Sequence, residues 1–480
     1  MTKSPNLALR SWVRIVAEHT RPDAVHWWTG TDEERAHVGT ALARSRRTER
    51  AEPDLERAPV MVSTHRRVDA GPTNVWMSPD DTQTRVWPLF HGSMRQRTMY
   101  VVPYMLGAPR SAFCKVGVEI TDSPQIVATI DALARSGACA LDQLAGSLDF
   151  ARGLHSLGSQ RLAERLIVHF PETVETWSIG SGSPTNALLC CGTEGLRLAS
   201  ARAREEGWLA EHMSVFSLTD PEGTNAYVAV AAADSDAAIE LEMMVSGARG
   251  WSCRKLGGET CWMRSAEDGR LRAICPELRN WEPSSGVPLS AIIFCGRQAR
   301  STPLVYEARS WRHGVYVGAT LMREVEGANW ATHNPMSMLA SCGYNMGDYF
   351  SHWFAVGRKL HYPPKIFHIN WFRSDGDGQR LWPGGSDNMR ILKWIAQRID
   401  GTAGARSSPL GLTPELESLD LDGLDLSPDR LEQLLSGNHG ALLRQAEMAR
   451  KFLAKFGDCL PAPLLMEHRL LVRRLQESLH

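Results

Sequence analysis

The segments SCGYNMGDYFSHWF at residues 341–354 and PPKIFHINWFRSDGDGQRLWPGGSDN at residues 363–388 carry the strongest structural signal in this chain. Their pattern predicts a helix that begins after a glycine turn, a buried strand over residues 365–372, and two glycine-rich turns. Trp371 and Phe372 stand side by side at the end of that strand. Two aromatic rings above glycine-rich loops suit the stacking of a flat ligand, although a core strand closed by a hydrophobic plug fits the same pattern.

The strings GYNMGDY, SHWF, PPKIFHINWFR and LWPGGSDN resemble the C-terminal half of the GTP-dependent phosphoenolpyruvate carboxykinases, and the resemblance recurs along most of the chain. It implies an α/β, two-lobed phosphoenolpyruvate carboxykinase-like fold with mixed sheets and a P-loop nucleotide site. In that family this region builds the guanine pocket, so the resemblance implies a cofactor-binding role for Trp371, Phe372 and Asn388. Arg380 and Gly385 stand where further aromatic rings of the family stack on the base.

Composition places the chain among soluble globular proteins. Its 480 residues are enough for one or two fused lobes, and 43% are hydrophobic while 22% are charged. The formal net charge of −1 supplies no basic field, so we expect neither nucleic acid nor a membrane as partner. We find no signal peptide and no run of about 20 apolar residues, which predicts a cytoplasmic protein. The cysteines form no CxxC pair, which favours reduced thiols over a zinc ribbon.

The order of patterns along the chain predicts three parts. Residues 1–60 form a helical N-terminal segment, residues 61–225 an N-terminal lobe, and residues 226–480 a C-terminal lobe with a helical tail that packs against it. Hydrophobic periodicity predicts helices at residues 7–19, 31–44, 126–134 and 195–206, and in the tail at 430–435, 441–456 and 464–479.

The segment YVAVAAADSDAAIELEMM at residues 227–244 stands where the family has a strand and its phosphate-binding loop. The residues AAI at 237–239 replace the family's Gly-Lys-Thr, so glycine's backbone freedom, the lysine charge and the threonine hydroxyl are lost together. Asp234 and Asp236 add carboxylates that repel a polyphosphate unless a cation lies between them. The resemblance therefore implies a degenerate P-loop, and we do not expect GTP to bind.

Two arginines are expected to bind a substrate carboxylate. Arg97 falls on the arginine of the RTMYV motif, which holds a substrate carboxylate in the family, and Arg297 matches the first arginine of the GGRRP motif. A surface ion pair is the alternative for Arg97. After Pro276 the chain lacks a long family segment that contains another substrate arginine. The expected lid, at residues 323–338, is shorter than the usual form, so it is not expected to close fully.

His212 aligns with the family's histidine metal ligand, and Glu259 replaces its aspartate ligand. A Cys-Gly pair at 191–192 replaces the family's double lysine, so one ligand of the family is absent. With Asp234 and Asp236, His212 and Glu259 form a mixed nitrogen and oxygen set that suits Mn²⁺, Fe²⁺ or Zn²⁺. A structural histidine and a solvated aspartate loop are the alternatives.

These features leave three functional hypotheses. The first is a repurposed lyase that decarboxylates a small oxaloacetate-like carboxylic acid with a divalent metal and without GTP, since a Lewis acid is enough to stabilise the enolate. The second is a catalytically inactive pseudoenzyme that binds a protein partner or a metabolite. The third is a GTP-dependent carboxykinase. That activity requires a phosphate-binding loop, two metal sites and a lid that closes. The sequence lacks most of the residues that form each of these in the family.

Overall fold

The structure is a computed structural model that describes residues 6–48, 60–63, 74–158, 165–170, 173–180, 192–233, 250–276, 284–297, 301–324, 331–375 and 378–478. The chain divides into two compact units. Unit 1 comprises Met1–Glu206 with Pro276–Ser285, and unit 2 comprises Gly207–Cys275 with Gly286–His480. The first unit includes the N-terminal helices, and the units divide at residue 206. The predicted domain boundaries at residues 60 and 225 stay predictions.

Unit 1 combines one sheet with flanking helices. Its strands are β1 (Ala24–Trp27), β2 (Val60–Ser63), β3 (Asn74–Trp76), β4 (Thr98–Leu106), β5 (Lys115–Thr121), β6 (Arg135–Ser136), β7 (Ala151–Ser156), β8 (Leu166–Phe170) and β9 (Glu175–Ile179). Its helices are α1 (Leu7–Thr20), α2 (Asp32–Thr48), α3 (Pro79–Val86), η1 (Trp87–Phe90), α4 (Pro124–Leu133), α5 (Ala138–Leu144) and α6 (Gly192–Glu206). The helices predicted at 7–19, 31–44, 126–134 and 195–206 are confirmed as α1, α2, α4 and α6.

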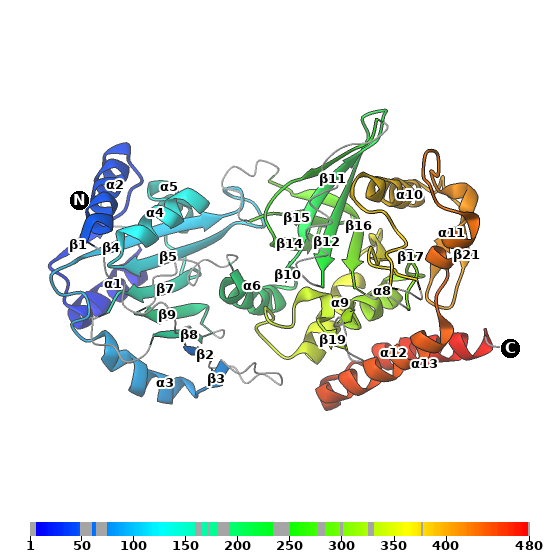
Figure 1. Cartoon of the computed structure of the whole chain (residues 1–480). Helices are drawn as coiled ribbons and strands as arrows, with labels where there is room; N and C mark the ends of the chain where they lie inside the picture. The colour runs from blue at the N-terminus through cyan, green and yellow to red at the C-terminus, as the bar shows by residue number, and fades with distance from the viewer. Residues whose placement is uncertain are drawn as a thin grey trace. The chain divides into compact units, whose positions relative to one another are not determined.

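The described strands of unit 1 form a nine-stranded sheet in the order β1-β4-β5-β7-β9-β8-β2-β3, with β6 attached to β4 (Figure 1). Strands β5, β7 and β9 run parallel, so their carboxyl ends share one edge of the sheet and their amino ends the other. Asp122, which directly follows β5, therefore lies at the carboxyl edge. Lys115 begins β5 at the opposite edge.

The hydrophobic core of unit 1 lies between α1 and one face of this sheet. The side chain of Asn6 caps α1 by accepting a 2.9 Å hydrogen bond from the backbone N–H of Leu9. Leu9 and Val13, one helical turn apart, pack against the face that includes Val118. Glu119 points to the other face of β5, where burial raises the pKa of its carboxyl well above the ordinary value.

Unit 2 contains the remaining elements. Its strands are β10 (Leu209–Glu211), β11 (Ser214–Thr219), β12 (Asn225–Ala232), β13 (Ser252–Lys255), β14 (Cys261–Ser265), β15 (Leu271–Ile274), β16 (Val287–Cys295), β17 (Val305–Glu307), β18 (Met322–Glu324), β19 (Ala331–His333), β20 (Lys365–Ile369), β21 (Ala405–Ser407) and β22 (Leu412–Pro414). Its helices are α8 (Trp311–Ala319), η4 (Pro335–Ser337), α9 (Met346–Gly357), η5 (Gly385–Asp387), α10 (Asn388–Asp400), η6 (Leu416–Ser418), α11 (Pro428–Leu435), α12 (His439–Leu453), η7 (Ala454–Cys459) and α13 (Ala462–Glu477).

The main sheet of unit 2 has eleven strands among the described residues. Its path is β10-β14-β15-β16-β20-β17-β22-β21, while β12 pairs with both β16 and β11, and β11 pairs with β13. Strands β12, β16 and β20 are neighbours and run parallel, so their carboxyl ends meet at one edge. Strands β18 and β19 form a separate hairpin.

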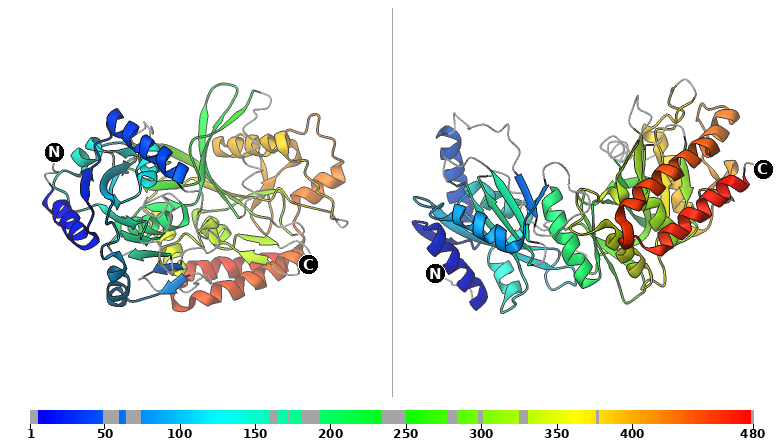
Figure 2. Two further views of the ribbon diagram at one scale, coloured as in Figure 1. Left: turned by 60° about the vertical axis from the view of Figure 1, so that its left-hand side comes forward. Right: turned by 90° about the horizontal axis from the view of Figure 1, so that it is seen from below.

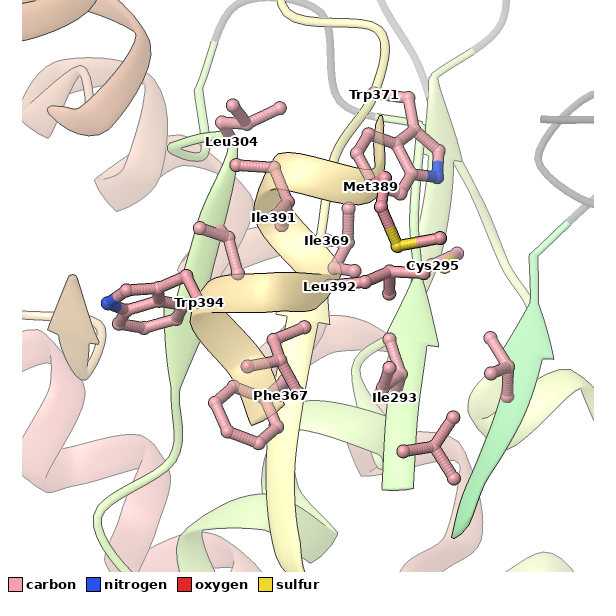
Figure 3. Close-up of a cluster of buried hydrophobic side chains, with 14 of the residues drawn as sticks. Ile293, Cys295, Leu304, Phe367, Ile369, Trp371, Met389, Ile391, Leu392 and Trp394 are labelled. Carbon is pink, nitrogen blue, oxygen red and sulfur yellow. The ribbon is translucent and has the colours of Figure 1, made fainter. Parts of the chain in front are cut away.

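One face of this sheet packs against α10, as Figure 3 shows. Phe367, Ile369 and Trp371 alternate along the chain, so all three turn toward the helix. From α10, Leu392 and Trp394 belong to the same buried cluster. The strand predicted over residues 365–372 is confirmed only as far as Ile369, and the two aromatic residues that follow lie in the next turn.

The tail helices pack against unit 2, as predicted. Helices α12 and α13 lie side by side (Figures 1 and 2), and α13 also contacts α8. Glu467 accepts a 2.6 Å hydrogen bond from Arg312, and the Tyr316 hydroxyl lies 3.0 Å from His468 Nδ1. None of the described helices combines the length and the apolar composition that crossing a membrane requires.

Candidate active site

The carboxyl edge of the three parallel strands in unit 2 carries much of the predicted site. Strand β12 leads into residues 234–249, which lie outside the described residues. Strand β16 leads to Arg297, and β20 leads to Trp371 and Phe372. Open α/β sheets commonly bind ligands at the carboxyl ends of their strands, so the position of these residues agrees with the predicted site, and their contact with a ligand stays a prediction.

Two arginine guanidinium groups lie close to the ring of Phe372. The guanidinium carbons of Arg297 and Arg380 lie 5.0 and 5.2 Å from the ring centroid, within the range of cation–π attraction. Arg380 Nε also donates a 3.0 Å hydrogen bond to the carbonyl of Trp371. The aromatic ring that the resemblance assigns to the base is therefore partnered by cations of the chain itself.

Trp371 and Asn388 are fully buried, and contact of their side chains with a nucleotide stays a prediction. Trp371 packs in the α10 core. Asn388 Oδ1 accepts a 2.7 Å hydrogen bond from the indole N–H of Trp382. Of the three residues assigned to the nucleotide, only Phe372 is partly exposed, and its contact with a ligand stays a prediction.

His212 and Glu259, two of the four predicted metal ligands, lie together. Strands β10 and β14 pair antiparallel, which brings the residue after β10 beside the residues before β14. His212 Nε2 lies 3.3 Å from Glu259 Oε2, and the two side chains are 41% and 66% exposed. A nitrogen donor and an oxygen donor are therefore adjacent and open to solvent.

Ser337 contacts the other ring nitrogen of His212, with 3.2 Å between its Oγ and Nδ1. Met336 and Ser337 both adopt left-handed backbone conformations, with φ of 51° and 60°, which costs about 1–2 kcal/mol per residue. In neutral His212, the Glu259 contact requires the proton on Nε2, so Ser337 donates to Nδ1. If Nε2 instead binds a metal, the ring proton is on Nδ1 and the Ser337 hydroxyl accepts a hydrogen bond from it. Ser337 can therefore pair with His212 in the metal-free and in the metal-bound tautomer.

Glu211 precedes His212 and is completely buried. It accepts hydrogen bonds from the hydroxyl of Tyr349 and, at 3.1 Å, from the indole N–H of Trp353, both on α9. Burial outweighs these two hydrogen bonds and raises the pKa of Glu211 to about 8. A largely protonated carboxyl thus ties β10 to α9 and fixes the backbone from which His212 projects. No motif in the sequence singled out this residue.

Two of the four predicted metal ligands, His212 and Glu259, lie in the part of the chain that the structure describes. Within the described ranges, no group of three or more His, Cys, Asp or Glu side chains is arranged to hold a metal ion. His212 and Glu259 offer an imidazole nitrogen and a carboxylate oxygen, which suit Mn²⁺, Fe²⁺ or Zn²⁺. Asp234 and Asp236 lie outside the described residues, so their share in the site stays a prediction.

Arg97, in unit 1, is engaged in an ion pair. Its Nη1 lies 3.0 Å from Oδ2 of the buried Asp122, and its Nη2 donates to the carbonyls of Ser93 at 2.7 Å and Gly158 at 2.6 Å. Arg97 therefore forms an ion pair, as the alternative to carboxylate binding predicted. The pair is partly buried, whereas that alternative placed it on the surface. A role in binding a substrate carboxylate stays a prediction.

The predicted lid at residues 323–338 is described only in part, because residues 325–330 lie outside the described ranges. The ring of His333, in β19, stacks on Phe452 of α12 with 4.4 Å between the centroids. Burial lowers the pKa of His333 to about 4, so the ring is neutral at physiological pH. The described part of this segment is therefore anchored to α12.

Comparison with known proteins covers both units. The phosphoenolpyruvate carboxykinase N-terminal domain matches residues 11–204, and the phosphoenolpyruvate carboxykinase C-terminal P-loop domain matches residues 208–279 and 278–474. The two C-terminal pieces meet close to the point where the sequence analysis placed a missing family segment.

Several relatives match nearly the whole chain. A phosphoenolpyruvate carboxykinase (GTP) of Anaeromyxobacter dehalogenans strain 2CP-C is 34% identical over 585 aligned positions, which cover 99% of this chain and 98% of the relative. A phosphoenolpyruvate carboxykinase (GTP) of Paenarthrobacter aurescens strain TC1 is 33% identical, and the alignment covers 97% of this chain and 97% of the relative. These alignments are longer than the 480 residues of this chain, so parts of the relatives have no counterpart in it.

The two units, each with its own mixed sheet, define a two-domain α/β protein, and the second unit is similar to the carboxykinase C-terminal P-loop domain. Both domain matches and the full-length relatives then specify the family. The chain belongs to the GTP-dependent phosphoenolpyruvate carboxykinase family. The predicted family and fold class are confirmed.

Proposed function

We propose that this family member is a lyase that decarboxylates a small oxaloacetate-like acid with a divalent metal ion and without GTP. The observation that supports this proposal best is the pair of His212 and Glu259, whose side chains approach to 3.3 Å and face solvent. The sequence AAI at 237–239 replaces the Gly-Lys-Thr that binds phosphates in the family. A site that keeps metal ligands and an arginine for the substrate carboxylate, but lacks the loop that binds phosphates, suits decarboxylation, which needs no phosphoryl donor.

The chain's own residues have separate tasks in this proposal. Arg297 binds the substrate carboxylate, since the guanidinium fork matches a carboxylate with two hydrogen bonds. His212, oriented by Ser337, and Glu259 would hold the metal ion. The bound ion supplies Lewis-acid stabilisation of the negative charge that develops as CO₂ leaves. Arg97 is the second candidate for the carboxylate, in competition with the Asp122 that it already contacts.

Two other functions each have an observation in their favour. A catalytically inactive binding protein is favoured by the ion pair of Arg97 with Asp122, because an arginine held this way is less available to substrate. GTP-dependent carboxykinase activity is favoured by the relatives, which carry that activity in their names at 34% identity. The experiment must therefore separate a nucleotide-free reaction, a nucleotide-dependent reaction and no reaction.

The test measures conversion of oxaloacetate by the purified full chain with Mn²⁺, against the same Mn²⁺ without protein, since free metal ions also decarboxylate this acid. Pyruvate and phosphoenolpyruvate are quantified separately, with and without GTP. We expect pyruvate above the metal background and no effect of GTP. His212→Ala should slow the reaction by about tenfold or more, as loss of metal-site residues does. Glu267→Gln, which changes an exposed acid of the same unit, should leave it unchanged.

Phosphoenolpyruvate formed only with GTP would replace the proposal by the carboxykinase function. Conversion no faster than Mn²⁺ alone, with or without GTP, would favour the inactive binding protein. A second readout does not depend on turnover: Mn²⁺ binding, followed by electron paramagnetic resonance, should weaken in His212→Ala and Glu259→Gln. Equal Mn²⁺ affinity in both variants and the parent chain would remove this pair from the metal site.

A further inference from the structure

Unit 1 contains a cavity of about 420 Å³ at the amino-terminal edge of its parallel strands. It is lined by the starts of β5 and β7, the turn before β9, the end of α5 with the loop that follows, and Arg202 of α6. This volume lies within the range of small-molecule sites. Arg97 contacts Asp122 at the other end of β5, about 20 Å away at the usual rise of a strand. The cavity is therefore distinct from the predicted substrate arginine of the same unit.

Arg152, at the wall of this cavity, has an unusual environment. Its guanidinium carbon lies 5.2 Å from the ring centroid of Phe150 and 5.9 Å from that of Trp12. Among the residues that the structure describes, its guanidinium makes no hydrogen bond and no ion pair, while its backbone N–H donates to the carbonyl of Val174 at 3.0 Å. Two aromatic rings thus hold the guanidinium in place by cation–π attraction while its N–H donors stay available.

The carboxylate on the neighbouring strand, that of Glu175, makes no ion pair with Arg152. Glu175 of β9 is the register partner of Arg152 and interacts with it electrostatically, yet its Oε1 accepts a 2.6 Å hydrogen bond from the indole N–H of Trp177. Burial raises the pKa of the Glu175 carboxyl, which weakens it as a counter-ion for Arg152. The other two cations of the cavity are already paired: Lys115 with Glu206, and Arg202 with Glu206 and, at 2.5 Å, with Asp149. Arg152 is therefore the cation among the cavity's described residues that is available to an anion.

The remaining walls indicate what kind of anion fits. Val116, Leu144, Leu148 and Val174 supply apolar surface, and Leu148 is 74% exposed at the rim. The other two cations of the cavity are compensated by Glu206 and Asp149, so Arg152 provides one positive charge and a monoanion is favoured over a dianionic phosphate. Val174 adopts a left-handed backbone with φ of 51°, which is rare for a β-branched residue and occurs preferentially at binding sites.

We propose that this cavity binds a small organic monocarboxylate with an apolar body. The carboxylate accepts hydrogen bonds from the guanidinium of Arg152, and the body lies against Leu144 and Leu148. The site is independent of the metal-assisted reaction proposed for unit 2, so either proposal can fail without the other.

The experiment titrates the full chain into 4-fluorobenzoate and follows the ¹⁹F resonance. We expect binding at millimolar or lower concentration. Arg152→Met keeps an unbranched aliphatic side chain at this position and removes the charge, so affinity should fall about tenfold or more. Arg85→Met, which removes an exposed arginine of α3 in the same unit, should leave affinity unchanged.

A second variant does not depend on the packing of Arg152. Leu148→Asp places a carboxylate at an exposed rim position and should weaken binding about threefold, with the fold intact by circular dichroism. Absence of binding to the parent chain at millimolar concentration, or equal binding to Arg152→Met or to Leu148→Asp, would overturn the proposal. Inorganic phosphate that displaces 4-fluorobenzoate with equal affinity would overturn the assignment to an organic monocarboxylate.

Discussion

Replacing Glu211 by glutamine tests the idea that a protonated carboxyl ties β10 to α9. The carboxyl is completely buried and accepts hydrogen bonds from Tyr349 and Trp353. Glutamine keeps the shape and stays neutral at every pH. Its oxygen can accept from Trp353 and its amide can donate to the Tyr349 hydroxyl, which is able to reverse its role. We expect a cost of about 1 kcal/mol at low pH from the altered hydrogen bonds.

The pH dependence follows from the pKa of Glu211. Burial raises it from 4.5 to about 8, so the folded chain binds this proton more tightly than the unfolded chain does. Between those two values the free energy of unfolding falls by about 1.4 kcal/mol per pH unit. The stabilisation is therefore complete below the unfolded pKa and is lost as the pH rises through the folded pKa. Between pH 5 and pH 9 this loss amounts to about 4 kcal/mol.

Urea unfolding of the parent chain and of Glu211→Gln, followed by far-ultraviolet circular dichroism from pH 5 to pH 9, measures the effect. The difference between the two free energies cancels the contribution of other titrating groups, including the buried Glu119. The variant should be less stable at pH 5 and more stable by several kcal/mol at pH 9. Glu267→Gln, a change of an exposed acid in the same unit, should give a pH-independent difference near zero.

A constant difference between the parent chain and Glu211→Gln across this range would refute the reasoning. It would mean that Glu211 is ionised in the folded chain at neutral pH, and that the two donors from α9 outweigh burial. A difference that grows in the opposite direction, with the variant losing stability as the pH rises, would lead to the same conclusion.

Three further substitutions test the packing. Phe367→Ala removes a fully buried ring from the α10 core and should lower the free energy of unfolding by about 3–5 kcal/mol in urea titrations. Gly347→Ala would place a Cβ 2.4 Å from the carbonyl oxygen of Cys459, so the backbone must shift and the melting temperature should fall, by the equivalent of about 1–3 kcal/mol. Asp122→Asn leaves the partly buried Arg97 without its anion and should cost about 2 kcal/mol by thermal unfolding, below the value for a fully buried pair because Arg97 is 29% exposed.

Gly39→Ala is the control for the glycine substitution, because nothing lies within 4 Å of the added Cβ and the residue is in α2. It should leave the melting temperature unchanged or raise it slightly. Equal effects of Gly39→Ala and Gly347→Ala would contradict the close approach of α9 to Cys459. An unchanged melting temperature in Asp122→Asn or in Phe367→Ala would contradict the burial of the corresponding group.

The sequence by itself determined the family, the fold class and most helices. Its literal motifs extend over both lobes, and the helices that it predicted in the tail are α11, α12 and α13. Periodicity also distinguishes the two aromatic residues after β20. Phe367, Ile369 and Trp371 alternate with period two, which places Trp371 on the core face and Phe372 on the other. Local spacing is enough for such predictions, because helices and strands repeat over a few residues.

Tertiary structure decided which charges meet, because those contacts join residues far apart in sequence. The partner of Arg97 is Asp122 at the end of another strand, and the ring of Phe372 receives the guanidinium of Arg297 as well as that of Arg380. The elevated pKa of Glu211 depends on burial beneath α9, which no local pattern encodes. Burial, desolvation and the choice of ion-pair partner are properties of the packed chain, so they appear only when the chain is folded.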